Sequence, residues 1–209
     1  NMVGFSYSAS GAENWSFGAQ ADGTVEWYYW VGSQKRLTTT TAILTSKWNH
    51  LAFTYDGTTM TIWINGVSSA TGSIDGTPTT IDDTITLTIG QVSTGQFNGK
   101  ISNLRVVKGR ALYNTGFEPP TKELTNVAQT VLLCCQSDSS TTTAAVIPTG
   151  SITASGDPTA GAQTITLSPT LGSSITWPTT TIWNGGSAPT LASANDYSLA
   201  GQVFNLTTA

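Results

Sequence analysis

Apolar and polar residues alternate along much of the chain, which is the pattern of β-strands with one buried face. The clearest run places Ile85, Leu87 and Ile89 on one face and threonines on the other. Runs of the same kind occupy residues 3–9, 14–19 and 59–64. No segment has the periodicity of a long amphipathic helix. The pattern therefore predicts an all-β fold.

Short turn motifs separate these runs. Asn-Gly and Asp-Gly pairs tolerate the positive φ angles that tight hairpins require. The chain has such pairs at 22–23, 56–57, 65–66, 75–76 and 98–99. Many short strands joined in this way are typical of a β-sandwich or a jelly roll.

Composition narrows the choice of function. Charged residues make up only 10% of the 209 residues, but seven Trp and a net charge of −4 indicate a folded chain. Nucleic-acid binding needs a basic face, and a pI near 4.7 with scattered Lys and Arg argues against it. No apolar run approaches the roughly 20 residues of a membrane span, so we expect no membrane partner. Because the chain opens at Asn1 and stops after a strand-like run, we interpret it as an excerpt.

The composition changes at residue 137, which predicts three parts. Residues 1–136 form the β-sandwich. Residues 137–163 are rich in Ser, Thr, Pro and Gly and are predicted to be a linker or an extended arm. Strand signals return in residues 164–209, which predict a small β appendage that continues beyond the chain end. This segment is too short to bury a robust core alone, so we expect it to contact a neighbour.

The two cysteines, Cys134 and Cys135, are adjacent in a strand-like run. Neighbours on a strand point to opposite faces, and a bridge between them would strain the backbone. We therefore predict two reduced thiols in a chain that is assembled inside a cell. A zinc site would need further ligands at suitable spacing, and the chain has a single His, so no metal site is predicted.

Two segments carry a family resemblance. Residues 47–57 run Trp-Asn-His-Leu-Ala-Phe-Thr-Tyr-Asp-Gly after Lys47, and residues 60–67 form an apolar strand that ends in Asn-Gly. Together they resemble the central hairpin of laminin-G-like and pentraxin-like domains, and residues 99–107 resemble a late strand of the same family. Ile101 and Leu104 would both face the core there, so a β-bulge near Ser102–Asn103 is expected.

This resemblance covers residues 1–136 and implies a concanavalin A-like (laminin-G-like) jelly-roll β-sandwich, with the C-terminal β appendage beyond it. It also implies that the opening strand of the family lies upstream of Asn1. His50 is a framework residue in the family pattern, and we expect a structural role for it.

A further resemblance is to virion proteins of marine and cyanobacterial phages. Residues 107–113, 117–125 and 130–136 resemble the version of the domain found there, and residues 175–191 resemble a module at the ends of phage structural proteins. This implies a non-enzymatic virion structural protein of the tail, fibre or capsid surface, assembled in the host cytoplasm. Its expected partners are other virion proteins, further copies of itself (a trimer is one option) and a host-surface glycan. The alternative is a lectin module of a secreted or surface protein.

Aromatic residues provide the candidate glycan face. Residues 25–31 place aromatics on both faces of one strand, and Trp63 stands on the threonine face of another. Exposed aromatic rings stack on sugars. We therefore take Trp27, Tyr29, Trp30 and Trp63 as candidates, with packing as the alternative for each.

Acidic residues favour neither catalysis nor a strong ion site. Glycoside hydrolases need paired carboxylates, but Glu26 is alone on its strand and Asp82 and Asp83 would point apart. A glycoside hydrolase-like domain is thus a remote alternative. Calcium needs several oxygen ligands from loops, and Asp75, Asp82 and Asp83 could supply some. Solvated loop carboxylates are the simpler interpretation, so no cofactor is expected.

Overall fold

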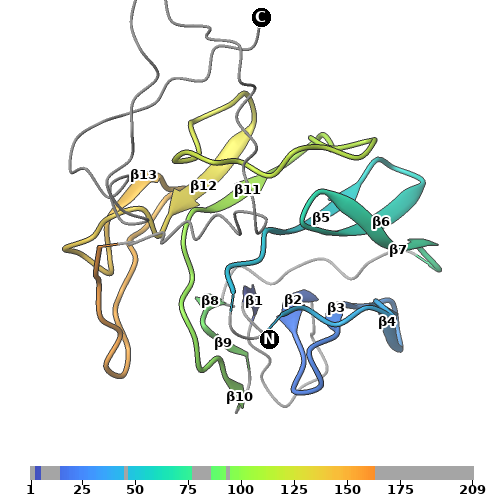
Figure 1. Ribbon diagram of the computed structural model, residues 1–209, viewed down its shortest axis with the longest axis horizontal. Helices are drawn as coiled ribbons and strands as arrows, with labels where there is room; N and C mark the ends of the chain where they lie inside the picture. The colour runs from blue at the N-terminus through green and yellow to red at the C-terminus, as the bar shows by residue number, and fades with distance from the viewer. Residues whose placement is uncertain (1–2, 6–14, 45–46, 77–85, 93–94, 163–209) are drawn as a thin grey trace, which may run out of the picture. The chain divides into compact units, whose positions relative to one another are not determined.

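The computed structural model describes residues 3–5, 15–44, 47–76, 86–92 and 95–162. The chain divides into two units, Asn1–Gln163 and Thr164–Ala209, and all the described residues belong to the first. The predicted appendage, residues 164–209, lies outside them. The described residues contain strands and no α-helix (Figure 1), and hence no helix that could cross a membrane.

The first sheet is antiparallel and contains most of the N-terminal strands. Among the described residues its order is β4-β3-β2-β1-β8. The strands are β1 (Val3–Phe5), β2 (Trp15–Ala19), β3 (Val25–Trp30), β4 (Gln34–Thr38) and β8 (Leu87–Ile89). The turn between β2 and β3 uses Gly23 at φ +83°, as the Asp-Gly motif predicted. The alternation at residues 87–89 likewise forms a strand.

The second sheet is the hairpin pair that the family resemblance singled out. It has the order β5-β6-β7, with β5 (Leu51–Tyr55), β6 (Thr59–Ile64) and β7 (Val67–Ser73). Asn65 and Gly66 both have positive φ, 51° and 80°, in the two-residue turn between β6 and β7. This is the geometry that an Asn-Gly hairpin turn requires.

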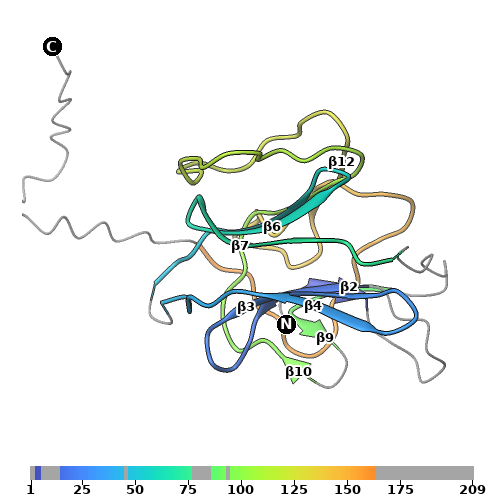
Figure 2. The same ribbon diagram turned by 90° about the vertical axis from the view of Figure 1, so that its right-hand side faces the viewer.

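The hydrophobic core lies between these two sheets, which form separate layers in Figure 2. Val25 of β3 and Ile62 of β6 are fully buried, and Ile64 completes the buried cluster. The partly buried side chains around it come from both sheets and the intervening loop: Phe17, Trp27, Leu37, Ile43, Leu51, Phe53 and Ala70. The described part of the chain is therefore an all-β sandwich, as the alternation predicted.

Residues 113–119, here called the cover segment, lie over the other side of the second sheet (Figure 2, yellow-green). The backbone N–H of Phe117 donates to the carbonyl oxygen of Gly66 at 3.1 Å. A Cβ atom on Gly66 would lie 1.7 Å from the Phe117 oxygen, so no other residue fits there without a backbone shift. As a result, β6 is buried on both faces: all of its residues except Thr59 are buried.

A third sheet has the order β11-β12-β13, and a short hairpin pairs β9 with β10. These strands are β9 (Gln91–Val92), β10 (Gly95–Gln96), β11 (Leu104–Val107), β12 (Thr130–Cys134) and β13 (Ala144–Val146). β13 lies within residues 137–163, so part of the predicted linker is a strand paired with β12.

The β-bulge expected near Ser102–Asn103 takes a different form. Asn103 has φ +56°, and β11 begins only at Leu104. The register shift between β11 and β12 falls later, between Val106 and Val107. The left-handed turn at Asn103, rather than a bulge, therefore breaks the alternation between Ile101 and Leu104.

Candidate ligand-binding face

Strand β3 sends its aromatic side chains to two opposite faces. The Trp27 ring stacks on Phe53 of the second sheet, with centroids 3.7 Å apart, and on Trp15 at 5.1 Å. Tyr29 points the same way as Trp27 and is 5% exposed. Both side chains therefore point into the sandwich, where Tyr29 is buried and Trp27 is partly buried. This corrects the expectation that Trp27 and Tyr29 form an exposed glycan face, because both side chains point toward the second sheet.

Trp63 is also inaccessible, for a different reason. It points away from the sandwich core, as its place on the threonine face predicted, but it is only 4% exposed. Its ring lies 5.7 Å from that of Phe117 in the cover segment. Its indole N–H donates to Thr54 Oγ1 at 2.9 Å. The expectation of an exposed Trp63 fails because the cover segment packs over this face.

The remaining candidate, Trp30, lies on the outer side of the first sheet. Glu26, Tyr28 and Trp30 alternate along β3 and share this side, and Arg36 of β4 is the pairing partner of Tyr28. We call these four residues the outer face. Tyr28 and Trp30 are half-buried, so part of each ring is accessible.

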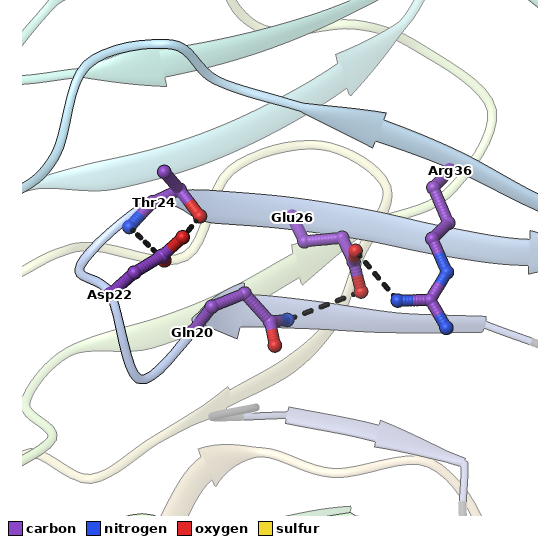
Figure 3. A network of polar contacts seen from close by, with 5 residues as sticks. All are labelled: Gln20, Asp22, Thr24, Glu26 and Arg36. Atoms are coloured by element: carbon purple, nitrogen blue, oxygen red, sulfur yellow. Dashed lines mark hydrogen bonds and ion pairs between the residues drawn. The ribbon is translucent and has the colours of Figure 1, made fainter.

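A buried carboxylate organises the outer face. Glu26 is 6% exposed, and its two oxygens accept hydrogen bonds from Gln20 Nε2 at 3.1 Å and Arg36 Nη1 at 3.0 Å. Figure 3 shows the Glu26 side chain between these two partners. The Arg36 guanidinium lies 5.6 Å from the centroid of the Tyr28 ring. The Glu26 carboxylate thus holds Arg36 against the tyrosine ring.

The outer face is closed at one end and open at the other. Ser16 of β2 is 3% exposed, whereas the Arg36 side chain of β4 is 53% exposed. Gln34 and Thr38 flank Arg36 on the same side of β4 and are exposed. The accessible part therefore combines two aromatic rings with amide, hydroxyl and guanidinium groups. Such a surface can stack on an apolar ring face and bond hydroxyl groups around it.

Tyr28 and Arg36 were not among the residues that the sequence predicted for this face. The alternation in residues 25–31 held the information, since Tyr28 shares a face with Trp30 and not with Trp27. What the alternation could not decide was which of the two aromatic faces points to the core. Arg36 counted only among the scattered Lys and Arg residues of the sequence, but it lies within β4.

Glu26 meets no second carboxylate in its hydrogen bonds or its strand pairing. Its bonding partners are an amide and a guanidinium, and it pairs across the strands with Gly18 and Thr38. A glycoside hydrolase mechanism needs two carboxyl groups about 5 to 9.5 Å apart. Asp82 and Asp83 lie outside the described residues.

Of the three calcium candidates, Asp75 lies in the described part of the chain, and Asp82 and Asp83 lie outside it. Asp75 forms an ion pair with Lys35, and this contact holds the pKa of Asp75 below its ordinary value. Calcium at Asp75 would have to displace the lysine. Within the same part of the chain, no three His, Cys, Asp or Glu side chains gather as a metal site would require.

His50 lies at the edge of the cover segment. Its ring stands edge-on to those of Phe117 and Tyr113, with centroids 5.4 and 6.2 Å apart. Its Nδ1 atom is buried and has no hydrogen-bond partner among the described residues. Burial, together with the positive charge of Arg105, lowers the pKa of His50. These contacts are those of a packed framework residue.

Comparison with known families agrees with this architecture. A sequence model of the laminin-G type, described as the concanavalin A-like lectin/glucanases superfamily, matches residues 2–115, just over half of the chain. The chain belongs to this superfamily. The match includes both layers of the concanavalin A-like sandwich and the whole outer face. No curated protein and no solved structure matches the chain.

Proposed function

We propose that this concanavalin A-like domain is a non-catalytic carbohydrate-binding module and that the glycan binds on the outer face. The observation that carries the proposal is the geometry of that face. Two half-buried aromatic rings, Tyr28 and Trp30, share this face, and the Tyr28 ring lies beside a guanidinium that a buried carboxylate holds in place. Protein sites for sugars combine such rings with a few fixed polar groups.

The spacing along β3 supports this assignment. Tyr28 and Trp30 are two residues apart, which places them about 6–7 Å apart along the strand. They can therefore contact neighbouring units of an oligosaccharide. Arg36 can donate to hydroxyl oxygens, since a guanidinium has several N–H groups and only Nη1 bonds to Glu26.

The absence of catalysis is part of the proposal. Glu26 is the carboxylate of the outer face, and its negative charge is already used to hold Gln20 and Arg36. A carboxylate held in this way is a positioning group. The lectin branch of the superfamily is therefore the better comparison than the glucanase branch.

The test is a glycan array with the purified chain and three variants. We expect specific binding that falls at least about tenfold in Trp30→Ala and in Arg36→Ala. Trp48→Ala is the matched control, because Trp48 is 48% exposed but lies in the loop before β5 and is not one of the outer-face residues. Binding that survives in both outer-face variants would contradict the proposed site. A folded wild type that binds no glycan would contradict the function.

The wider setting that we propose is a phage particle, where the module would attach the virion to a host glycan. The resemblance of residues 107–113, 117–125 and 130–136 to virion proteins supports this role. An edge strand supports it too: β7 is an outer strand of its sheet among the described residues, and Val67 is 66% exposed. Exposed edges can pair with another subunit. Light scattering would test this: a trimer or larger assembly is expected, and a monomer at all concentrations would count against self-assembly.

A further inference from the structure

Cys134 and Cys135 lie closer together than strand geometry allows. Alternation predicted thiols on opposite faces, but β12 ends at Cys134, and Cys135 has φ +60°. This left-handed backbone turns the second side chain back, and the two sulfur atoms are 3.7 Å apart. Both cysteines are free.

We propose that Cys134 and Cys135 form a reversible redox site, which a peroxide-class oxidant converts to a disulfide between the two neighbours. The accessibility of the two sulfurs supports distinct roles. Cys134 is 1% exposed, whereas Cys135 is half-buried and can meet a small oxidant. Cysteines that respond to oxidants are typically accessible and have a second thiol next to them.

The electrostatics of the pair agree with these roles. The hydrogen bond from the Cys134 thiol lowers the pKa of Cys135. The same contact, with burial, raises the pKa of Cys134. The thiolate is the reactive form, so Cys135 is the attacking group.

The reaction balances without any further reactant. The Cys135 thiolate attacks one peroxide oxygen, the O–O bond breaks, and the hydroxide that leaves takes up a proton to become water. The product is a sulfenic acid on Cys135. The Cys134 sulfur then attacks the Cys135 sulfur and displaces the second water, which carries the thiol proton. The two sulfurs lose two electrons and the peroxide gains them.

The product should be easily reduced. Neighbouring Cα atoms are about 3.8 Å apart across a trans peptide, but ordinary disulfides span about 4.4–6.8 Å. Strain of this kind makes a disulfide labile and suits a reversible site.

Formation of the disulfide would disturb the contacts that join the end of β12 to two other segments. The carbonyl oxygen of Cys135 accepts from the Asn103 N–H at 2.9 Å. The amide of Gln136 donates to Asn103 Oδ1 at 3.1 Å and to the carbonyl oxygen of Leu124 at 2.8 Å. A change in the backbone at Cys135 therefore loosens the contacts of residues 103 and 124 with the end of β12.

The experiment treats the folded full chain with hydrogen peroxide and counts its thiols. We expect both thiols to disappear and the peptide carrying both cysteines to lose two hydrogen atoms in mass, with full recovery in dithiothreitol. Amide hydrogen exchange at Asn103 should become at least about tenfold faster in the oxidised form. Disulfide-linked dimers, irreversible addition of oxygen, or unchanged thiols would each overturn the proposal.

Two single variants separate the roles of the cysteines. Cys134→Ala should leave Cys135 to accumulate as a sulfenic acid that dimedone traps. Cys135→Ala should leave a buried Cys134 that dimedone labels at least about tenfold more slowly. Equal labelling of the two variants would contradict the assigned roles. The mass change of the wild type decides the proposal even if a variant does not fold.

Discussion

The indole N–H of Trp63 donates to Thr54 Oγ1 across neighbouring strands at 2.9 Å, and both side chains are buried. A buried tryptophan needs a partner for its N–H, because an unsatisfied donor costs free energy. Thr54 meets that need. The pair explains why a large aromatic on the threonine face of β6 packs instead of binding a ligand.

This bond predicts a measurable coupling between the two residues. Trp63→Phe removes the donor and should lower the free energy of unfolding by about 1–3 kcal/mol, including the smaller ring. Thr54→Val should also destabilise the fold, because it leaves the indole N–H without its acceptor. The double variant should lose less than the sum, by at least about 0.5 kcal/mol in urea unfolding. If the losses of the two single variants were strictly additive, the hydrogen bond would contribute nothing to stability. Trp63→Phe should leave any glycan binding unchanged, because Trp63 is not on the outer face.

The close approach of Gly66 to Phe117 predicts a position where only glycine is accepted. Gly66→Ala introduces a Cβ atom 1.7 Å from the Phe117 oxygen, so the turn or the cover segment must move. Gly57→Ala is the matched control: its φ is +101°, but a Cβ atom there meets nothing within 4 Å.

We expect the control to lose about 1–2 kcal/mol through backbone strain alone. Gly66→Ala should lose at least about 2 kcal/mol more, measured by thermal or urea unfolding. Equal losses in the two variants would show that the cover segment does not press on the turn.

Burial of His50 predicts a stability that depends on pH. The pKa of His50 is lower in the folded chain than in the unfolded chain, so unfolding takes up a proton in the range between the two values. The free energy of unfolding should therefore fall as the pH decreases from about 7.5 to about 5.5. Tyr113 and Phe117 offer the ring no anionic partner, and Arg105 adds a positive charge.

The matched variant is His50→Phe, which keeps an aromatic ring against the cover segment and removes the titrating group. Its stability should change less over this pH range than that of the wild type. The carboxyl groups of Asp22, Asp56 and Asp75 have pKa values below the ordinary 3.8. Their contribution to the free energy of unfolding is therefore lost only at lower pH. An unchanged pH dependence in His50→Phe would assign the effect to another group.

The ion pair between Glu26 and Arg36 predicts that removing one partner destabilises the fold more than neutralising both partners. Arg36→Met leaves the buried Glu26 carboxylate with Gln20 and should destabilise the fold by about 1–2 kcal/mol. The double variant Glu26→Gln/Arg36→Met replaces the charge with a neutral amide and should recover part of this loss. Urea unfolding of the four combinations measures both effects. A double variant that is less stable than Arg36→Met would show that the unpaired charge of Glu26 is not the cause of the loss.

Much of the fold could be predicted from the sequence. The alternation of residues 15–19, 59–64 and 87–89 predicted strands, and Asn65-Gly66 predicted the turn that joins β6 to β7. These features are local: a side chain on a strand alternates with its neighbours, and the left-handed backbone favours glycine and asparagine. Residues 47–67 were also enough for the family resemblance that the comparison confirmed.

Local sequence thus sufficed for several strands, for their turns and for the grouping of Glu26, Tyr28 and Trp30 on one side of β3, but not for β13, which falls in the predicted linker. Packing between distant segments selected the side that meets the core: Trp27 stacks on Phe53, and the Phe117 ring lies over Trp63. Alternation cannot distinguish two aromatic faces, because burial depends on what packs against each face, and those partners are distant in sequence. The contact between the Cys134 and Cys135 sulfurs has a similar origin, since it depends on a left-handed residue stabilised by a bond to Asn103.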